Sequence, residues 1–487
     1  MGTITIVGLG PGDPRHLTEE ACAVLETAGE VWLRTRHHPT VAGLPSRLAL
    51  HSFDDLYEAA EDFLQVYDAI AGRVLRLGER PEGVVYAVPG HPLVGEATVR
   101  KILSRAEDAG LATHVVEGLS FVGPTLTALR IDALSGLQIC DAVELAACHH
   151  PPLNPDLPAL VGQLYSQVLA VDVKLTLMNQ YPDDHGVVLV HAAGTPEQRV
   201  THLPLYELDR RDEGDRWVRL AHLTALYVPP LPAVSGFEGL QDTVAHLRAP
   251  DGCPWDREQT HDSLRRGLLE EAYETLAAID AGDVQMLQEE LGDVLLQVLL
   301  HAQIATEEGE FKMAQVIAGI DAKLKHRHPH VWGARPVTGT REVLQRWEEL
   351  KREEKGEDRS VLDGVPAALP ALQQADTYSR RAARVGFDWA EASGVAAKIC
   401  EEIAEVEAAV TSDEREAELG DLLFAVVNWS RWLGVDPESA LRRANARFGR
   451  RFRGMERMAR ERGLDMTALT IDELEVLWRE AKLADGW

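Results

Sequence analysis

Residues 269–274 read Leu-Glu-Glu-Ala-Tyr-Glu and are followed at 290–293 by Glu-Leu-Gly-Asp. The pattern returns at 400–405 as Cys-Glu-Glu-Ile-Ala-Glu, followed at 418–421 by the same Glu-Leu-Gly-Asp. Side chains three positions apart share one face of an α-helix. Each segment is therefore predicted to be a helix that points two carboxylates the same way, and the two copies predict two structural repeats.

Within each repeat, packing the two acidic helices together brings four carboxylates into one place. Like charges in a partly buried cleft repel and raise one another's pKa unless a cation neutralises them. An all-oxygen ligand set favours Mg²⁺, with Mn²⁺ also suitable. An acidic run is usually a solvated face, but the duplication and the apolar segment after each motif favour a metal site. The two predicted ligand sets are Glu271, Glu274, Glu290 and Asp293, and Glu402, Glu405, Glu418 and Asp421.

Downstream of the acidic motifs, the repeats also match in basic and aromatic residues. Cations suit the phosphates of a nucleoside triphosphate, and an indole ring can stack on a base or sugar. A packed tryptophan and solvated arginines are the alternative interpretation. The positions in the second repeat are Arg447, Arg451, Trp478 and Lys482, which match Lys323, Arg327, Trp347 and Lys351 in the first.

Residues from about 236 to 487 resemble the MazG-type nucleoside triphosphate pyrophosphohydrolases. The resemblance is carried by Gly-Cys-Pro-Trp-Asp at 252–256, by the acidic motifs at 268–274 and 289–293, and by His-Arg-His-Pro-His-Val at 326–331. Members of that family are all-α enzymes. The resemblance implies Mg²⁺-dependent cleavage of NTPs or dNTPs between the α and β phosphates, which yields a monophosphate and pyrophosphate.

The same resemblance implies that the second repeat is the competent one. Lys398 lies one helical turn before Glu402, whereas the matching position of the first repeat is Gly267. A carboxylate, either Glu401 or Glu402, is expected to act as the general base. The positions that the resemblance assigns to nucleotide contacts are Lys398, Arg447, Arg451, Trp478 and Lys482.

The first 225 residues follow a different pattern, in which short β-branched runs end in glycine. Thr3-Ile-Thr-Ile-Val7 leads directly into a glycine turn, and two later runs end in the same way. This pattern predicts an α/β domain with a ligand at the carboxyl edge of its sheet, although glycines also end strands for structural reasons alone. The residues at these exits are Gly8, Gly10, Gly12, Asp13, Pro89, Gly90, Gly118 and Ser120.

These loops, at 9–13, 89–94 and 117–121, resemble the S-adenosylmethionine site of the tetrapyrrole (corrin/porphyrin) methylases. His91 stands where dedicated methylases usually have an aspartate. The whole chain resembles fusion proteins in which an α/β methylase-like domain precedes two all-α MazG-like repeats. The resemblance implies that the first domain binds S-adenosylmethionine and leaves methyl transfer itself open.

The domain boundaries are predicted from changes in composition. A proline-rich stretch marks a linker at 226–240. The methylase-like domain is then expected at 1–225, the first helical repeat at 241–362 and the second at 371–487.

Composition limits the class of partner. The formal charge of −29 argues against nonspecific binding of nucleic acid, whose phosphates such a surface repels. No signal peptide and no apolar stretch long enough to span a membrane is present, and the five cysteines lack a paired motif, so a cytoplasmic protein is expected. Short acidic helices need partners, which predicts a homodimer through the MazG half.

Two histidine clusters, His149 with His150 and His326 with His328 and His330, lack the spacing of a strong zinc site. The sequence therefore favours a Mg²⁺-dependent NTP pyrophosphohydrolase with a fused S-adenosylmethionine-binding domain. One alternative is a nucleotide and S-adenosylmethionine sensor or scaffold without turnover. The other is a tetrapyrrole-type methyltransferase as the main activity.

Overall fold

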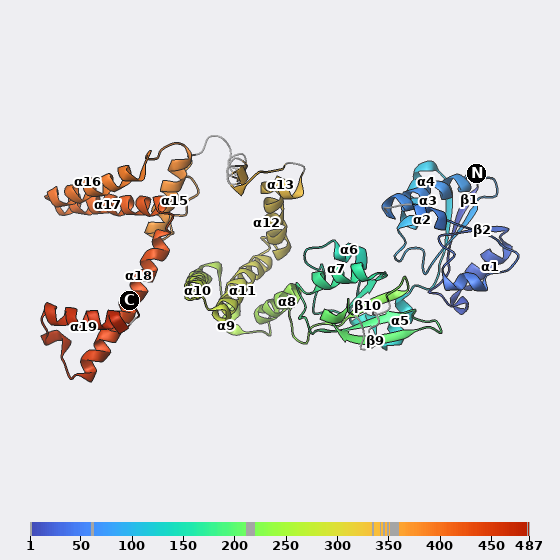
Figure 1. Ribbon diagram of the computed structural model, residues 1–487, viewed down its shortest axis with the longest axis horizontal. Coiled ribbons are helices and arrows are strands. Elements are labelled where there is room, and N and C mark those ends of the chain that lie inside the picture. The colour runs from blue at the N-terminus through green and yellow to red at the C-terminus, as the bar shows by residue number, and fades with distance from the viewer. Residues whose placement is uncertain are drawn as a thin grey trace. The chain divides into compact units, whose positions relative to one another are not determined.

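The computed structural model describes residues 2–59, 63–210, 220–333, 336–340, 342–343, 346–347, 350, 360–484 and 486. The chain forms two compact units, Met1–Glu258 and Gln259–Trp487, and each is described by itself (Figure 1). The linker expected at 226–240 and the domain limits derived from it stay predictions.

The first unit begins with a parallel five-stranded sheet in the order β3-β2-β4-β1-β5. Alternate residues of a strand face opposite sides, and β1 shows this: Ile4 and Ile6 pack into one apolar core while Val7 packs into the other. The strands are β1 (Thr3–Gly8), β2 (Glu30–Leu33), β3 (Ala49–Ser52), β4 (Val84–Val88) and β5 (Ala112–Val116). Short and long helices accompany them: α1 (Glu19–Thr27), α2 (Asp54–Ala59), α3 (Phe63–Gly78) and α4 (Ala97–Ala109), with 3₁₀ turns η1 (Pro14–His16) and η2 (Pro39–Gly43).

A second, mixed sheet in the order β6-β7-β10-β8-β9 follows, in which only β6 and β7 pair in parallel. Its main core includes Val161, Val173, Leu189 and Leu226. The strands are β6 (Gln138–Asp141), β7 (Ala159–Gly162), β8 (Gly186–His191), β9 (Arg199–Pro204) and β10 (Thr224–Val228). The remaining helices of this unit are α5 (Val122–Leu129), α6 (Ala142–Ala146), α7 (Gln167–Leu177), α8 (Phe237–Arg248) and α9 (Pro254–Arg257), with turns η3 (Ala133–Ser135) and η4 (Leu205–Glu207).

Helices alone make up the described part of the second unit. Each acidic motif lies on a hairpin of two long helices, as the three-residue spacing predicts: α10 (His261–Ala281) with α11 (Val284–Glu308), and α16 (Ala392–Ala408) with α17 (Ser412–Trp432). The turns between these helices are short and well capped. Gly282 ends α10 in the left-handed region and the Asp283 side chain caps α11, while Thr411 and Glu414 form a capping box on α17. The other helices are α12 (Met313–Arg327), α13 (Pro329–Trp332), α15 (Ala371–Arg384), α18 (Pro437–Glu461) and α19 (Ile471–Ala484), with the turn η5 (Met466–Ala468).

This architecture confirms the expected class of an α/β methylase-like domain followed by an all-α part with two repeats. Among the described residues, no helix combines the length and the apolar character that a bilayer span requires. All five cysteines are free thiols.

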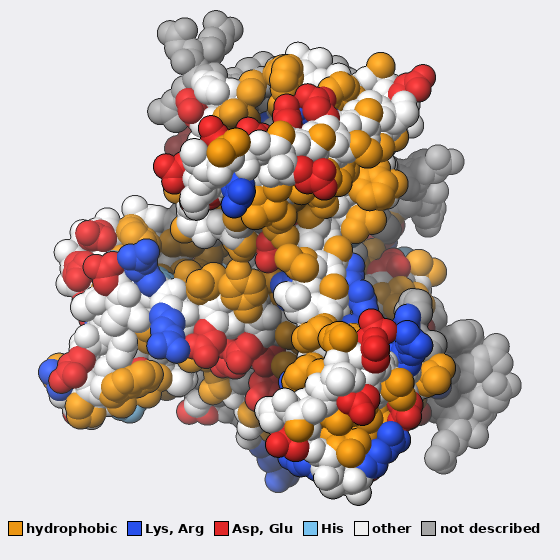
Figure 2. Space-filling model, turned by 90° about the vertical axis from the view of Figure 1, so that its left-hand side faces the viewer, with side chains coloured by type: hydrophobic (Ala, Val, Ile, Leu, Met, Phe, Trp, Pro, Cys, Tyr) orange, Lys and Arg blue, Asp and Glu red, His pale blue; other side chains and the backbone are white. Residues whose placement is uncertain are grey.

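Many large apolar side chains of the second unit remain exposed. Figure 2 shows hydrophobic side chains gathered on its surface between acidic and basic ones. Leu269 and Leu291 on the first hairpin are 57% and 52% exposed, and Leu419 and Leu423 on the second are 48% and 52% exposed. Exposed apolar groups on this scale are typical of protein–protein interfaces. The homodimer expected through this half stays a prediction.

Candidate metal centres and candidate cofactor site

The two helical hairpins hold matching carboxylate clusters. On α16 and α17, one carboxylate oxygen from each of Glu402, Glu405 and Glu418 lies within 4.8 Å of the others. On α10 and α11, carboxylate oxygens of three residues lie equally close together: Glu271, Glu274 and Glu290. The structure therefore brings together three of the four carboxylates predicted in each repeat. The fourth carboxylates, Asp293 and Asp421, lie one turn further along α11 and α17.

Burial and neighbouring carboxylates raise the pKa of some members of each cluster. Desolvation and the nearby charges of Asp293 and Glu274 raise the pKa of Glu271, and desolvation with Glu274 and Asp293 raises that of Glu290. Asp293 therefore acts electrostatically on the cluster although it lies outside the group of three. In the second repeat, desolvation is the main cause that raises the pKa of Glu405, and Glu402 adds to it. A bound cation would remove this repulsion.

Glu402 supplies the strongest structural sign that the second cluster suits a metal ion. Glu402 is only 4% exposed, and its Oε2 atom is buried without a hydrogen-bond partner among the described residues. A buried carboxylate oxygen that lacks a donor is costly. Because the surrounding ligand atoms are carboxylate oxygens, the residues present fit a hard divalent cation such as Mg²⁺ or Mn²⁺.

Lys398 lies beside the second cluster. Its ammonium nitrogen is 2.8 Å from an oxygen of Glu401, 2.8 Å from one of Glu402 and 3.9 Å from one of Glu405. The hydrogen bonds with Glu401 and Glu402 raise the pKa of Lys398, so it stays charged. The lysine predicted to contact nucleotide is therefore also the internal counter-ion of the carboxylates.

The first repeat is crowded at the position that matches this lysine. A Cβ atom at Gly267, which matches Lys398, would lie 3.0 Å from Nε2 of Gln297. Gln297 is itself mostly buried, and the position that matches it in the second repeat is the smaller Ala425. The two hairpins thus differ at two matching positions. The first has Gly267 next to Gln297, and the second has Lys398 and Ala425 at these positions.

The other residues assigned to nucleotide contacts lie on a separate helix pair. Arg447 and Arg451 belong to α18, and Trp478 and Lys482 belong to α19. The Trp478 ring is partly buried against the core of this pair, with its centroid 5.2 Å from that of Phe448. Trp478 therefore packs in the α18–α19 core.

In the first unit, the three glycine-bearing loops meet at the ends of adjacent strands β1, β4 and β5. Gly10 and Gly90 exchange backbone hydrogen bonds of 3.2 and 2.8 Å. A Cβ atom at Gly8 would lie 2.6 Å from the Gly118 nitrogen, and one at Gly118 would lie 2.3 Å from the Gly90 carbonyl oxygen. Only glycine permits this approach, which leaves backbone groups at the sheet edge where a cofactor of a parallel α/β domain binds.

Other residues predicted for the cofactor site have structural partners. Asp13 caps η1 and accepts hydrogen bonds from the Arg15 backbone at 2.9 Å and from its guanidinium at 2.7 Å, which lower the pKa of Asp13 to about 2. The Ser120 hydroxyl accepts a bond from the Val122 backbone, and Pro89 directly precedes Gly90.

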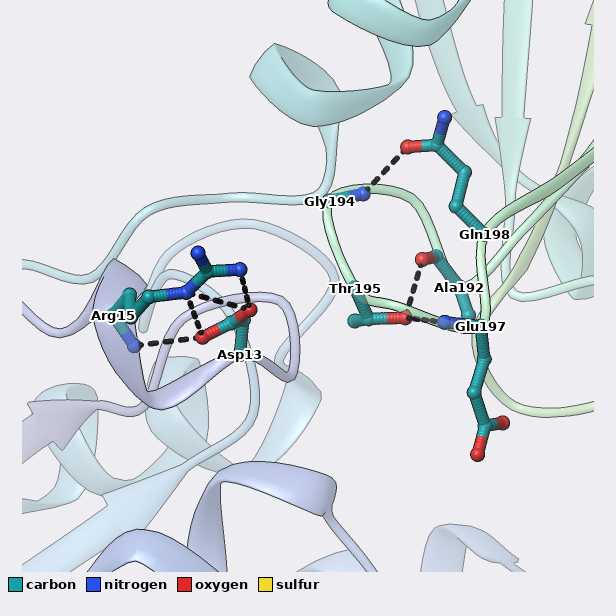
Figure 3. Close-up of polar contacts among 7 residues, drawn as sticks. All are labelled: Asp13, Arg15, Ala192, Gly194, Thr195, Glu197 and Gln198. Atoms are coloured by element: carbon teal, nitrogen blue, oxygen red, sulfur yellow. Dashed lines mark hydrogen bonds and ion pairs between the residues drawn. The ribbon is translucent and has the colours of Figure 1, made fainter.

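Figure 3 shows the loop that contains Gly194 and Thr195 beside the loop of Asp13 and Arg15. The Thr195 hydroxyl donates to the Ala192 carbonyl oxygen at 2.8 Å and accepts from the Glu197 backbone. A Cβ atom at Gly12 would lie 3.1 Å from the Thr195 methyl group. A segment from the second sheet therefore borders the first glycine loop closely.

The sequence did not single out two polar features near these loops. Arg34 follows β2 and forms a buried ion pair with Glu96, and its guanidinium also donates to the Tyr57 hydroxyl at 3.0 Å. His38 is 5% exposed, and neither of its ring nitrogens has a hydrogen-bond partner among the described residues. Arg34 could have been found from the sequence, because it directly follows a run that predicts a buried strand. His38 could not, because nothing in the local sequence distinguishes it from the exposed His37.

Comparison with known proteins finds a matching family for each half of the chain. The family model of the tetrapyrrole (corrin/porphyrin) methylases matches residues 3–209, and that of the MazG nucleotide pyrophosphohydrolase domain matches 259–332. The uncharacterised protein YabN of Bacillus subtilis (strain 168) is 42% identical over 491 residues, which cover 99% of this chain and 98% of that protein.

Two further relatives match the helical half. The nucleoside triphosphate pyrophosphohydrolase/pyrophosphatase MazG of Thermotoga maritima is 46% identical over 250 residues, 51% of this chain and 96% of that protein. The nucleoside triphosphate pyrophosphohydrolase of Escherichia coli (strain K12) is 46% identical over 244 residues, 48% of this chain and 93% of that protein. The chain therefore belongs to the family of proteins that join a tetrapyrrole methylase domain to a MazG nucleoside triphosphate pyrophosphohydrolase domain.

The buried, unpartnered imidazole of His38 predicts a pH dependence of stability. Burial lowers its pKa to about 4, whereas a histidine in the unfolded chain titrates near 6.5. Between these values the unfolded chain binds the extra proton and the folded chain does not, so the free energy of unfolding falls as the pH is lowered. The loss between pH 7 and pH 5 should be roughly 2 kcal/mol.

Chemical denaturation of the full chain at both pH values measures this loss as the change in the free energy of unfolding of the first unit. His38→Gln should remove most of it, and His202→Gln, at an exposed position of β9, serves as the matched control. An equal fall in the His38→Gln and native proteins would contradict the assignment.

Proposed function

We propose that the helical half hydrolyses NTPs or dNTPs between the α and β phosphates, with Mg²⁺ held by the second-repeat carboxylates. The observation that carries this proposal is the cluster of Glu402, Glu405 and Glu418, in which one buried carboxylate oxygen has no partner. The activity printed for the relatives from Thermotoga maritima and Escherichia coli supports the same reaction. In this proposal Asp421 is the fourth ligand.

The residues around the cluster divide the chemical tasks. A bound divalent cation lowers the pKa of a water molecule and screens the triphosphate. Glu402 is buried, so it suits the role of ligand, whereas Glu401 is exposed beside it and is our choice of general base. Glu401 would accept the proton of the attacking water while the bond between phosphorus and the bridging oxygen breaks and pyrophosphate leaves. Lys398, freed from the carboxylates by the cation, would bind a phosphate oxygen.

The second repeat is the proposed site of turnover because it alone has the lysine. In the first repeat the carboxylates lack this cation, and Gln297 fills the space next to Gly267. We propose that Glu271, Glu274, Glu290 and Asp293 bind a cation there without fast turnover. The α18–α19 residues Arg447, Arg451, Trp478 and Lys482 remain the proposed nucleotide contacts.

Pyrophosphate release from a panel of NTPs and dNTPs in the presence of Mg²⁺ tests this proposal. The native chain should release one pyrophosphate per nucleotide, and a chelator should stop the reaction. Glu402→Gln should lower the rate by about 100-fold or more, because a ligand that stabilises charge in the transition state is lost. Glu271→Gln and the control Glu407→Gln, at an exposed position of α16, should retain most of the rate.

Different outcomes separate the alternatives. No pyrophosphate from the native chain would favour the sensor or scaffold interpretation. Loss of release in Glu271→Gln alone would move turnover to the first repeat. Release of orthophosphate in place of pyrophosphate would rule out the proposed bond.

We further propose that the glycine loops of the first unit bind S-adenosylmethionine. The match to the methylase family and the close approach of Gly8, Gly90 and Gly118 support this proposal. The geometry carries no argument about the methyl acceptor, so a methyltransferase role stays the alternative main activity.

Titration calorimetry with S-adenosylmethionine tests the binding proposal. The native chain should bind one equivalent, and Gly118→Ala should lose binding, because its Cβ atom would overlap the Gly90 carbonyl group. Gly29→Ala, which meets no heavy atom within 4 Å, is the control. Unchanged pyrophosphate release by Gly118→Ala would show that the helical half remains folded, and equal binding by both variants would contradict the site.

A further inference from the structure

A second type of side-chain cluster lies at the open end of the first helical hairpin. His261 is the first residue of α10, Glu308 is the last of α11, and Glu310 follows two residues later. One possible ligand atom from each of these three side chains lies within 4.8 Å of the others. His261 and Glu271 are ten residues apart on the same helix, a separation of about 15 Å. This cluster is therefore distinct from the carboxylate cluster described above.

Local backbone structure fixes the three positions. The side chains of Thr260 and Ser263 form a capping box that sets the start of α10 and hence the place of His261. At the other helix, Gly309 adopts a left-handed conformation with φ of 76°, and the Glu310 backbone donates to the Ala305 carbonyl oxygen at 2.9 Å. This turn closes α11 and returns the chain, so that Glu308 and Glu310 both approach His261.

His301 gives His261 the kind of support that histidine ligands of metals have. The two Nδ1 atoms are 2.7 Å apart, and the rings stack with their centroids 5.0 Å apart and their planes 5° from parallel. A metal-bound histidine usually passes its second ring N–H to a hydrogen-bond partner, which orients the ring. The Nε2 atom of His301 is buried without a partner among the described residues.

The second hairpin closes its open end by different chemistry. There Asp388, just before α16, pairs with Arg431 and accepts a hydrogen bond from Nε1 of Trp432 at 3.2 Å, both at the end of α17. An anion on one side and a cation on the other hold the two helices together. At the first hairpin the three grouped side chains include two carboxylates and an imidazole, and a cation between them would complete the same kind of closure.

We propose that His261, Glu308 and Glu310 bind a transition-metal ion of the Zn²⁺ type, which ties the start of α10 to the end of α11. One imidazole nitrogen with two carboxylates suits Zn²⁺ better than Mg²⁺, because Mg²⁺ prefers oxygen ligands alone. Three protein ligands leave a position for water. This inference does not depend on the proposed hydrolase activity.

Equilibrium dialysis of the full chain against Zn²⁺ tests the proposal, with excess Mg²⁺ to occupy the carboxylate clusters. The native chain should retain one Zn²⁺, and Co²⁺ in its place should give a visible absorption band whose intensity reports tetrahedral-type coordination. Glu308→Gln and Glu310→Gln, both at exposed positions, should weaken binding by at least about 10-fold, and His261→Asn should do the same. Adding Zn²⁺ should raise the midpoint of thermal unfolding of the native chain, and these variants should not show that rise.

Two controls separate this site from the others. Glu307→Gln changes the same charge at the neighbouring position and should keep the bound ion. Glu271→Gln combined with Glu402→Gln removes a carboxylate from each of the other clusters and should also keep it. The proposal is overturned if the native chain retains no Zn²⁺ in excess Mg²⁺, if Glu308→Gln and His261→Asn retain it fully, or if only the double variant loses it.

Discussion

Repulsion among carboxylates on paired helices is the constraint on which the second unit depends. A helix that begins with a good cap and repeats its acidic residues every three positions directs them to one face, and a short capped turn returns the second helix against that face. The cost of the arrangement is visible in the raised pKa of Glu271, Glu290 and Glu405. This repulsion is the physical basis of the metal ion that we propose for each cluster.

The two repeats meet this constraint differently. In the second, Lys398 contributes a positive charge from within the same helix, and the small Ala425 stands where the first repeat has Gln297. In the first, the matching residue is Gly267, and a side chain there would crowd Gln297. A metal ion in the second cluster would displace Lys398 from the carboxylates, whereas the first repeat has no lysine at the matching position. This difference is the physical basis of our proposal that the second repeat turns over substrate and the first only holds a cation.

Features that depend on local periodicity were predictable from the sequence. The acidic spacing predicted both hairpins, and glycines after β-branched runs predicted an α/β domain. That the loops of Gly8, Gly90 and Gly118 meet at adjacent strand ends is what the structure adds. Features that depend on residues far apart in the sequence were not predictable. The pairing of Arg34 with Glu96 and the contact of His261 with His301 join residues 62 and 40 positions apart, and the burial of His38 follows from packing that no local pattern encodes.

Binding of Mn²⁺ to the full chain, followed by its electron paramagnetic resonance signal, tests most directly whether the carboxylate clusters are metal sites. Competition with Mg²⁺ would show that the two ions share them. The metal-site assignment predicts that Glu402→Gln and Glu271→Gln each remove one bound Mn²⁺ and that the double variant removes both, when all are made in a His261→Asn chain so that the third site is absent. Mn²⁺ binding that is absent from the native chain, or unchanged in the double variant, would contradict it.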